Sequence, residues 1–135
     1  MDYRTNRDMT NYLFFNTRDE FDRIDISKIV CFQSDGNYTN VVLTNKIKVV
    51  LGISLSKMEK YLSDTLREKA SCFVRVGKSC IINVNYILRI NVLKQYVVLT
   101  DYDTSNYQVT ISKDALKKLK DIMVTSVLKK SINKQ

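Results

Sequence analysis

The stretch IVCFQSDGNYTNVVL, residues 29–43, decides how the rest of this chain is interpreted. Two apolar runs rich in β-branched and aromatic residues flank the polar break Ser34-Asp35-Gly36-Asn37, and such runs favour strands. Asp-Gly is a strong turn pair, because glycine adopts positive φ without steric cost and aspartate can bond its local backbone. The stretch therefore predicts strand, short polar loop, strand, and a polar loop on a stiff β platform is suited to recognition.

Short strand-like runs continue on both sides of this hairpin. Apolar or alternating runs bounded by polar turns predict further strands at residues 12–16, 21–26, 47–51, 72–76, 80–82, 87–92, 95–100 and 107–111. With the hairpin, this makes about nine or ten short strands. No repeat, linker composition or proline interrupts them, so we expect one mainly β domain over residues 12–124. We expect residues 1–11 to be a mobile lead-in and residues 125–135 a basic helix end or tail.

Two segments show helical spacing instead. The first runs over residues 54–66 with Ser54 as its N-cap, and the second follows Ser112, with Asp114 in its first turn where the helix dipole favours an acid. Lys117, Lys118 and Lys120 fall on or near the polar side of the second helix. Each helix has an apolar stripe that we interpret as core: Leu55, Met58, Tyr61, Leu62 and Leu66 in the first, and Leu116, Leu119, Met123 and Val127 in the second.

Composition bounds the class of protein. The 135 residues suffice for one domain with a proper core, and 44% hydrophobic with 27% charged residues is ordinary for a globular chain. The net charge of +8 favours a polyanionic partner, because Lys and Arg that neutralise phosphates release condensed counterions. Many basic proteins bind no nucleic acid, however, and an anionic membrane surface would also attract this charge.

Several kinds of chemistry are disfavoured. The chain has no histidine, which is the usual general base and the commonest metal ligand. It also shows no nucleophile–base pair, phosphate-cradling loop or metal set, so we expect neither an enzyme nor a cofactor.

Cys31, Cys72 and Cys80 show no CxxC spacing and fit buried small hydrophobes in a reducing compartment. No window has the apolar length of a membrane span and the N-terminus is not a signal peptide, so we expect a cytoplasmic protein.

Three segments together resemble one known family. The run around Ser34-Asp35-Gly36-Asn37-Tyr38-Thr39 resembles the opening signature of the LytTR family of bacterial DNA-binding domains. The stretch SLSKMEKYL (residues 54–62) resembles the family's SLKELEEXL helix, and FVRVGKSCIINVNYI (residues 73–87) resembles its FXRXHRSXIVNXXXI segment. Each piece alone is weak, but their order and spacing over residues 12–124 make the resemblance strong.

The resemblance implies a fold and a mode of binding. LytTR domains are elongated folds of small successive antiparallel sheets, with one helix packed on them and a C-terminal helix. They read double-stranded DNA with loops set on β-sheet, commonly at direct repeats that two molecules occupy. They are usually joined to a receiver or membrane sensor domain, and nothing here resembles a receiver. The chain is therefore either a fragment or a stand-alone regulator controlled by another protein, and Met1 slightly favours a complete chain.

The resemblance also selects DNA-binding residues in the first loop. Without it, the Asp35-Gly36-Asn37 loop is best interpreted as a hairpin turn and nothing more. With it, Asn37 is the residue we expect to read a base, since an amide can pair with adenine through both edges. Tyr38 either contacts a backbone phosphate or packs within the protein.

The second and third loops follow the family pattern with one departure. Lys78 can reach a guanine edge or a phosphate, and Ser79 can bond a phosphate oxygen. The alternative for Lys78 is a solvated turn lysine. The family commonly has histidine where Gly77 stands, which puts one contact in doubt or gives it to the backbone N–H. Arg75 matches the family's arginine in the preceding strand, and two partners stay open for it: phosphate or a carboxylate inside the protein. Asn83 matches the family's asparagine, and we expect it to tie the loop.

At the start of the second helix, Ser112 and Lys113 match the family's last contact loop. A helix N-terminus with a hydroxyl and a cation is suited to binding phosphate. Ser112 is also an ordinary N-cap, so only Lys113 favours phosphate binding over a purely structural role. The sequence thus predicts a transcriptional regulator that binds specific double-stranded DNA. The alternative is a protein-interaction module of the same fold with only non-specific DNA affinity, meeting a regulatory protein partner through the second helix and the basic tail.

Overall fold

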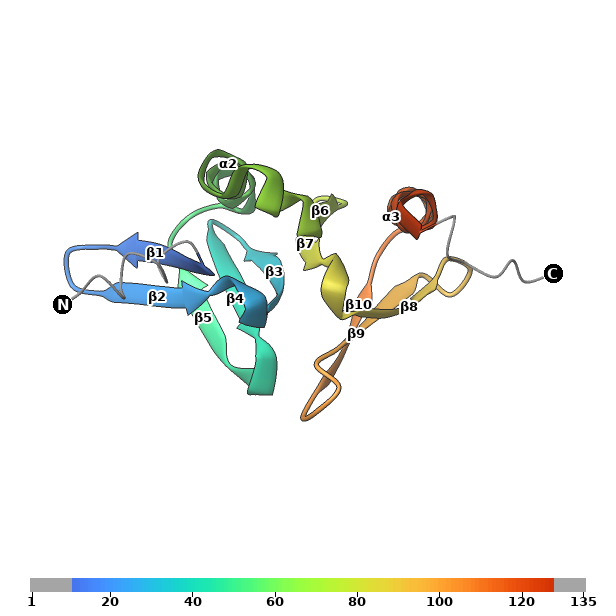
Figure 1. The fold of residues 1–135 in the computed structure, drawn as a ribbon, viewed down its shortest axis with the longest axis horizontal. Coiled ribbons are helices and arrows are strands. Elements are labelled where there is room, and N and C mark those ends of the chain that lie inside the picture. Colours follow the sequence, from blue (N-terminus) through green and yellow to red (C-terminus); the bar gives the residue numbers. More distant parts are fainter. Residues whose placement is uncertain (1–10, 128–135) are drawn as a thin grey trace.

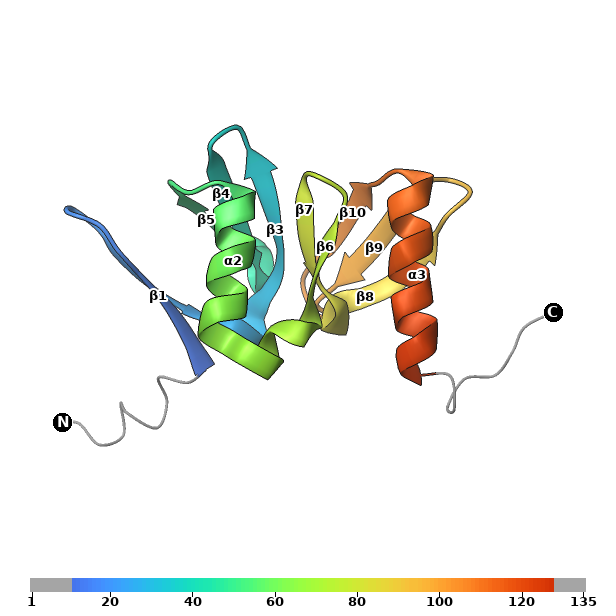
Figure 2. The ribbon, with the colours of Figure 1, turned by 90° about the horizontal axis from the view of Figure 1, so that it is seen from above.

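The computed structural model describes residues 11–127, in which ten strands form three antiparallel sheets and two helices pack on them (Figure 1). The sheets follow one another along the longest axis of an elongated molecule (Figures 1 and 2). This confirms the predicted fold class. The expectations for residues 1–10 and 128–135, the lead-in and most of the tail, lie outside the described residues.

A two-stranded ribbon begins the chain. Strands β1 (Tyr12–Asn16) and β2 (Phe21–Asp25) pair with Leu13 opposite Ile24. Both of these side chains are buried, because they face the next layer, whereas Phe21 is 62% exposed at the end of the ribbon. Successive residues of a strand point to opposite faces, so one face of the ribbon closes a core and the other faces solvent.

The central five-stranded sheet has the order β5-β4-β3-β7-β6. Its two middle strands are the predicted hairpin, which turns more tightly than the sequence suggested. Asp35 pairs with Tyr38, so Ser34 and Asp35 belong to the strand and only Gly36 and Asn37 form the turn, with Gly36 at φ +62°. Two-residue turns match the strand twist and extend the pairing to the tip. The strands are β3 (Ile29–Asp35), β4 (Tyr38–Leu43), β5 (Lys48–Leu51), β6 (Phe73–Val76) and β7 (Cys80–Asn83).

A three-stranded sheet, β8 (Ile87–Asn91), β9 (Tyr96–Thr100) and β10 (Asn106–Thr110), follows in the order β10-β9-β8. Single 3₁₀ turns connect several elements: η2 (Ile26–Lys28), η3 (Thr44–Lys46), η4 (Arg67–Cys72) and η5 (Val84–Tyr86).

Each helix covers a different core. Helix α2 (Leu55–Leu66) packs between the ribbon and one face of the five-stranded sheet, burying Leu55, Met58, Leu62 and Leu66 as predicted. Helix α3 (Lys113–Val127) and the three-stranded sheet cover the opposite face. The predicted stripe of α3 is only partly buried: Leu116 and Leu119 are buried, Met123 is half-buried and Val127 is 43% exposed. The C-terminal half of α3 extends beyond the sheet in Figure 2, which explains the difference.

The cysteines divide into two kinds. Cys31 and Cys80 are buried on neighbouring strands, which confirms the expected burial of these two, whereas Cys72 is half-buried in η4. The contact with Cys80, together with burial, raises the pKa of the Cys31 thiol far above its usual range. Cys31 is therefore a neutral thiol and behaves as a small hydrophobe.

Buried Asn83 ties β7 to the start of β3, as expected. Its amide donates to the Ile29 carbonyl at 2.8 Å, and its oxygen accepts from the Asn85 N–H at 3.0 Å. We expect Asn83→Ala to lower the free energy of unfolding by about 3 kcal/mol, because two backbone groups lose their partner. Urea denaturation measures this change. The control Asn85→Ala, at an exposed side chain of η5, should change it by less than about 0.5 kcal/mol, and an equally small effect of Asn83→Ala would contradict this role.

Candidate nucleic-acid interface

Three connections lie along one side of the molecule, at the top of Figure 2: the β3–β4 turn, the β6–β7 turn and the loop from β10 into α3. The Ser34 N–H donates to the Ser79 carbonyl at 2.9 Å, which joins the first two. A Cβ built on Gly77 would lie 3.8 Å from the Ala115 Cβ, so the second turn also touches the start of α3. These contacts bring all seven residues selected from the sequence onto this side of the molecule.

The first turn presents Asn37 and Tyr38. Asn37 is exposed and Tyr38 is 55% exposed, and neither side chain makes a hydrogen bond among residues 11–127. The rim of the Tyr38 ring lies near Gly52, where a Cβ would be 3.9 Å from the ring. The turn therefore presents a solvent-exposed amide at its tip, with the partly exposed Tyr38 phenol beside it.

The second turn is held from within by Arg75. Its guanidinium donates to the Gly77 carbonyl at 3.1 Å and the Lys78 carbonyl at 2.9 Å, and it pairs with Glu59 of α2 at 2.9 Å. Of the two partners weighed for Arg75, the structure shows the internal carboxylate. Gly77 has φ +68°, a left-handed conformation that other residues adopt at a cost. A Cβ at this position would meet only ordinary contacts, so the backbone conformation, and not a lack of space, favours glycine. Lys78 and Ser79, which follow Gly77, are exposed.

We expect Arg75→Gln to lower the free energy of unfolding by about 2 kcal/mol, because a half-buried cation loses three partners. NMR signals of residues 77–79 should broaden as the turn loosens. The matched change Glu59→Gln keeps both carbonyl contacts and should cost less than about 1 kcal/mol. Equal costs for the two variants, with residues 77–79 unchanged, would show that Arg75 does not hold the turn.

The third connection begins helix α3. The Ser112 hydroxyl accepts from the Ala115 N–H at 3.4 Å, so Ser112 is the N-cap predicted from the sequence. Lys113, the first residue of the helix, is exposed. Lys113 therefore adds a cation to the first turn of α3, and the positive end of the helix at this turn already favours an anion.

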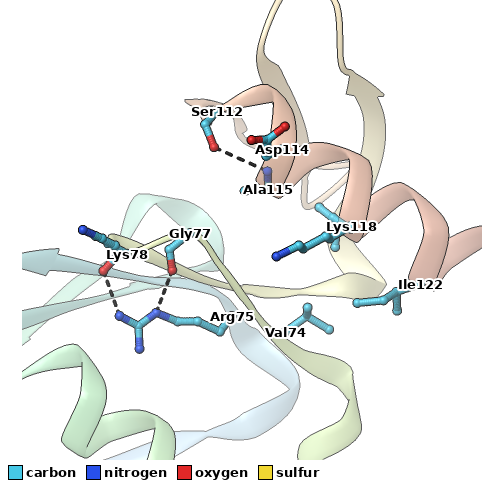
Figure 3. Close-up of a pocket in the computed structure, with 10 residues that line it drawn as sticks. Val74, Arg75, Gly77, Lys78, Ser112, Asp114, Ala115, Lys118 and Ile122 are labelled. Atoms are coloured by element: carbon cyan, nitrogen blue, oxygen red, sulfur yellow. Dashed lines mark hydrogen bonds between the residues drawn. The ribbon is translucent and has the colours of Figure 1, made fainter.

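A cleft of about 540 Å³ lies between the β6–β7 hairpin and α3, and Figure 3 shows its lining. The Lys118 ammonium points into the cleft, whereas the Lys78 side chain points away from it. Val74 and Ile122 form part of its apolar wall. The sequence showed Lys118 only as one of several lysines on the polar side of a helix, and its place beside the turn depends on tertiary packing.

A second hollow, of about 220 Å³, lies between the first two turns and β10, with Gln33 and Asn40 in its wall. These residues are opposite each other on β3 and β4, so two further amides lie just behind the Asn37 tip. Neither residue was predicted as part of the site, although strand alternation places both on the face that they share with Asp35. Among residues 11–127 no group of acidic or cysteine side chains could hold a metal ion, and no helix there is long and apolar enough to cross a bilayer.

Comparison with known proteins agrees with this geometry. The family model of the LytTr DNA-binding domain matches residues 19–124. The chain is 32% identical over 100 residues to the heme-containing CO-sensing transcriptional regulator RcoM 2 of Paraburkholderia xenovorans (strain LB400), and 31% identical over 100 residues to RcoM 1 of the same strain. Each alignment covers 74% of this chain and 35% of the relative.

Among solved structures, the chain is similar to the LytTr DNA-binding domain of a Bacillus cereus protein described as a methyl-accepting/DNA response regulator. The TM-score is 0.59 at 18% identity, over 84% of this chain and 96% of that one. At this identity the match shows the shared fold. The ribbon strand β1 lies before the segment that the family model matches.

Proposed function

The chain belongs to the LytTR family of DNA-binding domains, and from this membership we propose that it binds specific double-stranded DNA as a bacterial transcriptional regulator. The observation that carries the proposal is the row of three polar or basic connections along one side of a rigid β scaffold. Loops held by strands and a helix can enter a groove without losing much conformational freedom. The net charge of +8 attracts the duplex before specific contacts form.

Each connection has a proposed role in this complex. Asn37, whose side chain is exposed at a turn tip, reads a base, and Tyr38 contacts the adjacent phosphate. Lys78 reaches a guanine edge or phosphate, and Ser79 bonds a phosphate oxygen. Ser112 and Lys113 hold a phosphate at the N-terminus of α3. Arg75 acts through the second turn, whose two carbonyls it binds.

Two molecules occupying a direct repeat complete the proposal. A single domain reads few base pairs, so a second copy on the same site adds affinity and specificity. The place of action is the cytoplasm, where bacterial DNA lies. The signal reaches the domain through another protein or a further domain.

Selection of random duplex DNA on the purified protein tests the proposed function. We expect a recovered motif with repeated half-sites about one helical turn, 10 base pairs, apart. Asn37→Ala should then relax preference at one base position, while Asn85→Ala, at an exposed asparagine of η5, should leave the motif unchanged. Recovery of unrelated sequences, with binding lost at physiological salt, would show that charge alone attracted the DNA.

An interaction module is the second candidate, and the exposed apolar end of α3 favours it. Ile122, Val124 and Val127 are each 43–44% exposed there. A regulatory protein partner that covers this end would remove these apolar side chains from water. This candidate gains support if the selection above recovers no motif.

A further inference from the structure

A polar junction joins the two larger sheets. It lies away from the β3–β4 turn, the β6–β7 turn and the loop from β10 into α3. The junction joins η3, which follows β4, to the loop of residues 101–105 between β9 and β10. Strand β4 runs from the β3–β4 turn to η3. Strand β10 runs from the 101–105 loop to the loop that leads into α3. The junction therefore joins the far ends of two strands whose near ends carry proposed DNA contacts.

Asp101 is the centre of this junction. Its carboxylate accepts from the N–H groups of Asp103, Thr104 and Ser105 at 2.8–2.9 Å, which shapes its own loop. It also accepts from the Asn45 N–H, across the junction, at 3.2 Å. The N–H groups of Ser105 and Asp103 hold the pKa of this carboxyl well below its usual range. An ionised carboxylate thus joins the loop to η3 by charge-assisted hydrogen bonds.

Tyr107 makes the second cross-link. Its hydroxyl donates to the Leu43 carbonyl at 3.1 Å and accepts from the Lys46 N–H at 3.2 Å. Asn45 and Lys46 have φ values of 62° and 63°, an uncommon conformation for two successive residues other than glycine. Their N–H groups both point across the junction, so the cross-links compensate the cost of this local conformation.

Directional bonds at this place matter because the core that the two sheets share among residues 11–127 is apolar. The shared core contains Val42 and Ile82 of one sheet and Val97 and Leu99 of the other, and hydrophobic burial has no preferred direction. Five strand residues span roughly 17 Å. A tilt of about 10° at the junction would therefore move a contact connection by about 3 Å, which is the length of a hydrogen bond.

We propose that Asp101 and Tyr107 are positioning residues, which fix the angle between the two sheets and so the spacing between the first and third DNA contacts. This inference rests on the proposed function. The residues themselves touch no DNA, and they act through the geometry of the β4 and β10 strands.

The test uses Asp101→Asn and Tyr107→Phe in the full chain, with Asp103→Asn as the matched control. Asp103 lies in the same loop, its side chain is exposed, and its replacement changes the net charge equally. Residual dipolar couplings of the backbone N–H groups in the free proteins report the angle between the sheets. Affinity for the duplex selected by the wild-type protein reports the spacing of the contacts.

We expect both junction variants to show a changed or averaged angle between the sheets, and affinity for the selected duplex to fall by about tenfold, the equivalent of about one hydrogen bond. Asp101→Asn and Asp103→Asn each make the protein more basic, which alone would strengthen DNA binding. A loss of affinity that appears in Asp101→Asn and not in Asp103→Asn therefore cannot arise from charge.

Two results would overturn the inference: couplings in folded Asp101→Asn and Tyr107→Phe that match the wild type, or DNA affinities that match Asp103→Asn. If Asp101→Asn does not fold, Tyr107→Phe decides, because it removes a single hydroxyl. If the wild-type protein selects no motif, the proposed function fails, while the couplings still measure what the junction does to the angle between the sheets.

Discussion

Phe32→Ala is expected to lower the free energy of unfolding by about 4 kcal/mol, the usual cost of removing a buried aromatic ring. Phe32 lies on β3 with 0% of its surface exposed, and its ring meets the Phe73 ring edge-on at 5.5 Å. It belongs to the core that α2 and the ribbon share with the five-stranded sheet. A domain of this size has about 5–15 kcal/mol of stability in all, so much of it would be lost.

Urea denaturation followed by circular dichroism measures this loss. Phe21→Ala is the control, since the Phe21 ring is 62% exposed and only stacks on Phe14 at 6.0 Å. It should cost less than about 1 kcal/mol. Similar costs for the two variants would contradict the assignment of Phe32 to the centre of the core.

The second large effect concerns DNA. The double variant Lys78→Ala/Lys113→Ala removes one exposed cation from each of two proposed contact connections. At physiological salt we expect affinity for the selected duplex to fall by about a hundredfold or more. The slope of log K against log salt concentration should become shallower by about 2, because about two phosphates are no longer neutralised. Titrations at several salt concentrations measure both quantities.

Lys28→Ala/Lys48→Ala provides the charge-matched control. These two lysines are exposed in η2 and at the start of β5, away from the three connections. This pair should change affinity only slightly, through the long-range field. An equal loss for both pairs would mean that net charge, rather than the proposed contacts, determines binding.

Most of the fold followed from local patterns. Asp35-Gly36 predicted the central hairpin, and the period of apolar residues separated the two helices from the strands, as the buried side chains of α2 show. Local patterns could not show that β3 continues to Asp35, because the pairing with Tyr38 decides where the turn begins. They also could not show where α3 leaves the sheet, since the stripe containing Val127 continues past the surface that covers it.

The candidate site came chiefly from the family resemblance, and the structure adds what spacing in sequence cannot. Arg75 matched a family arginine, but its partner Glu59 lies 16 positions earlier, on α2. The direction of Lys118 into the cleft depends on how α3 packs beside the second turn. The cross-links of Asp101 and Tyr107 reach back 56 and 61 positions, and no local pattern predicts such contacts.

Titration of the isotopically labelled protein with its selected duplex, followed by NMR shifts of the assigned backbone signals, shows which residues meet DNA. If the three connections bind the duplex, the largest shifts should fall at residues 36–38, 77–79 and 112–113, while residues 44–46 and 101–105 shift little. Largest shifts on the ribbon or at the C-terminal end of α3, with the three connections unchanged, would contradict this mode of binding.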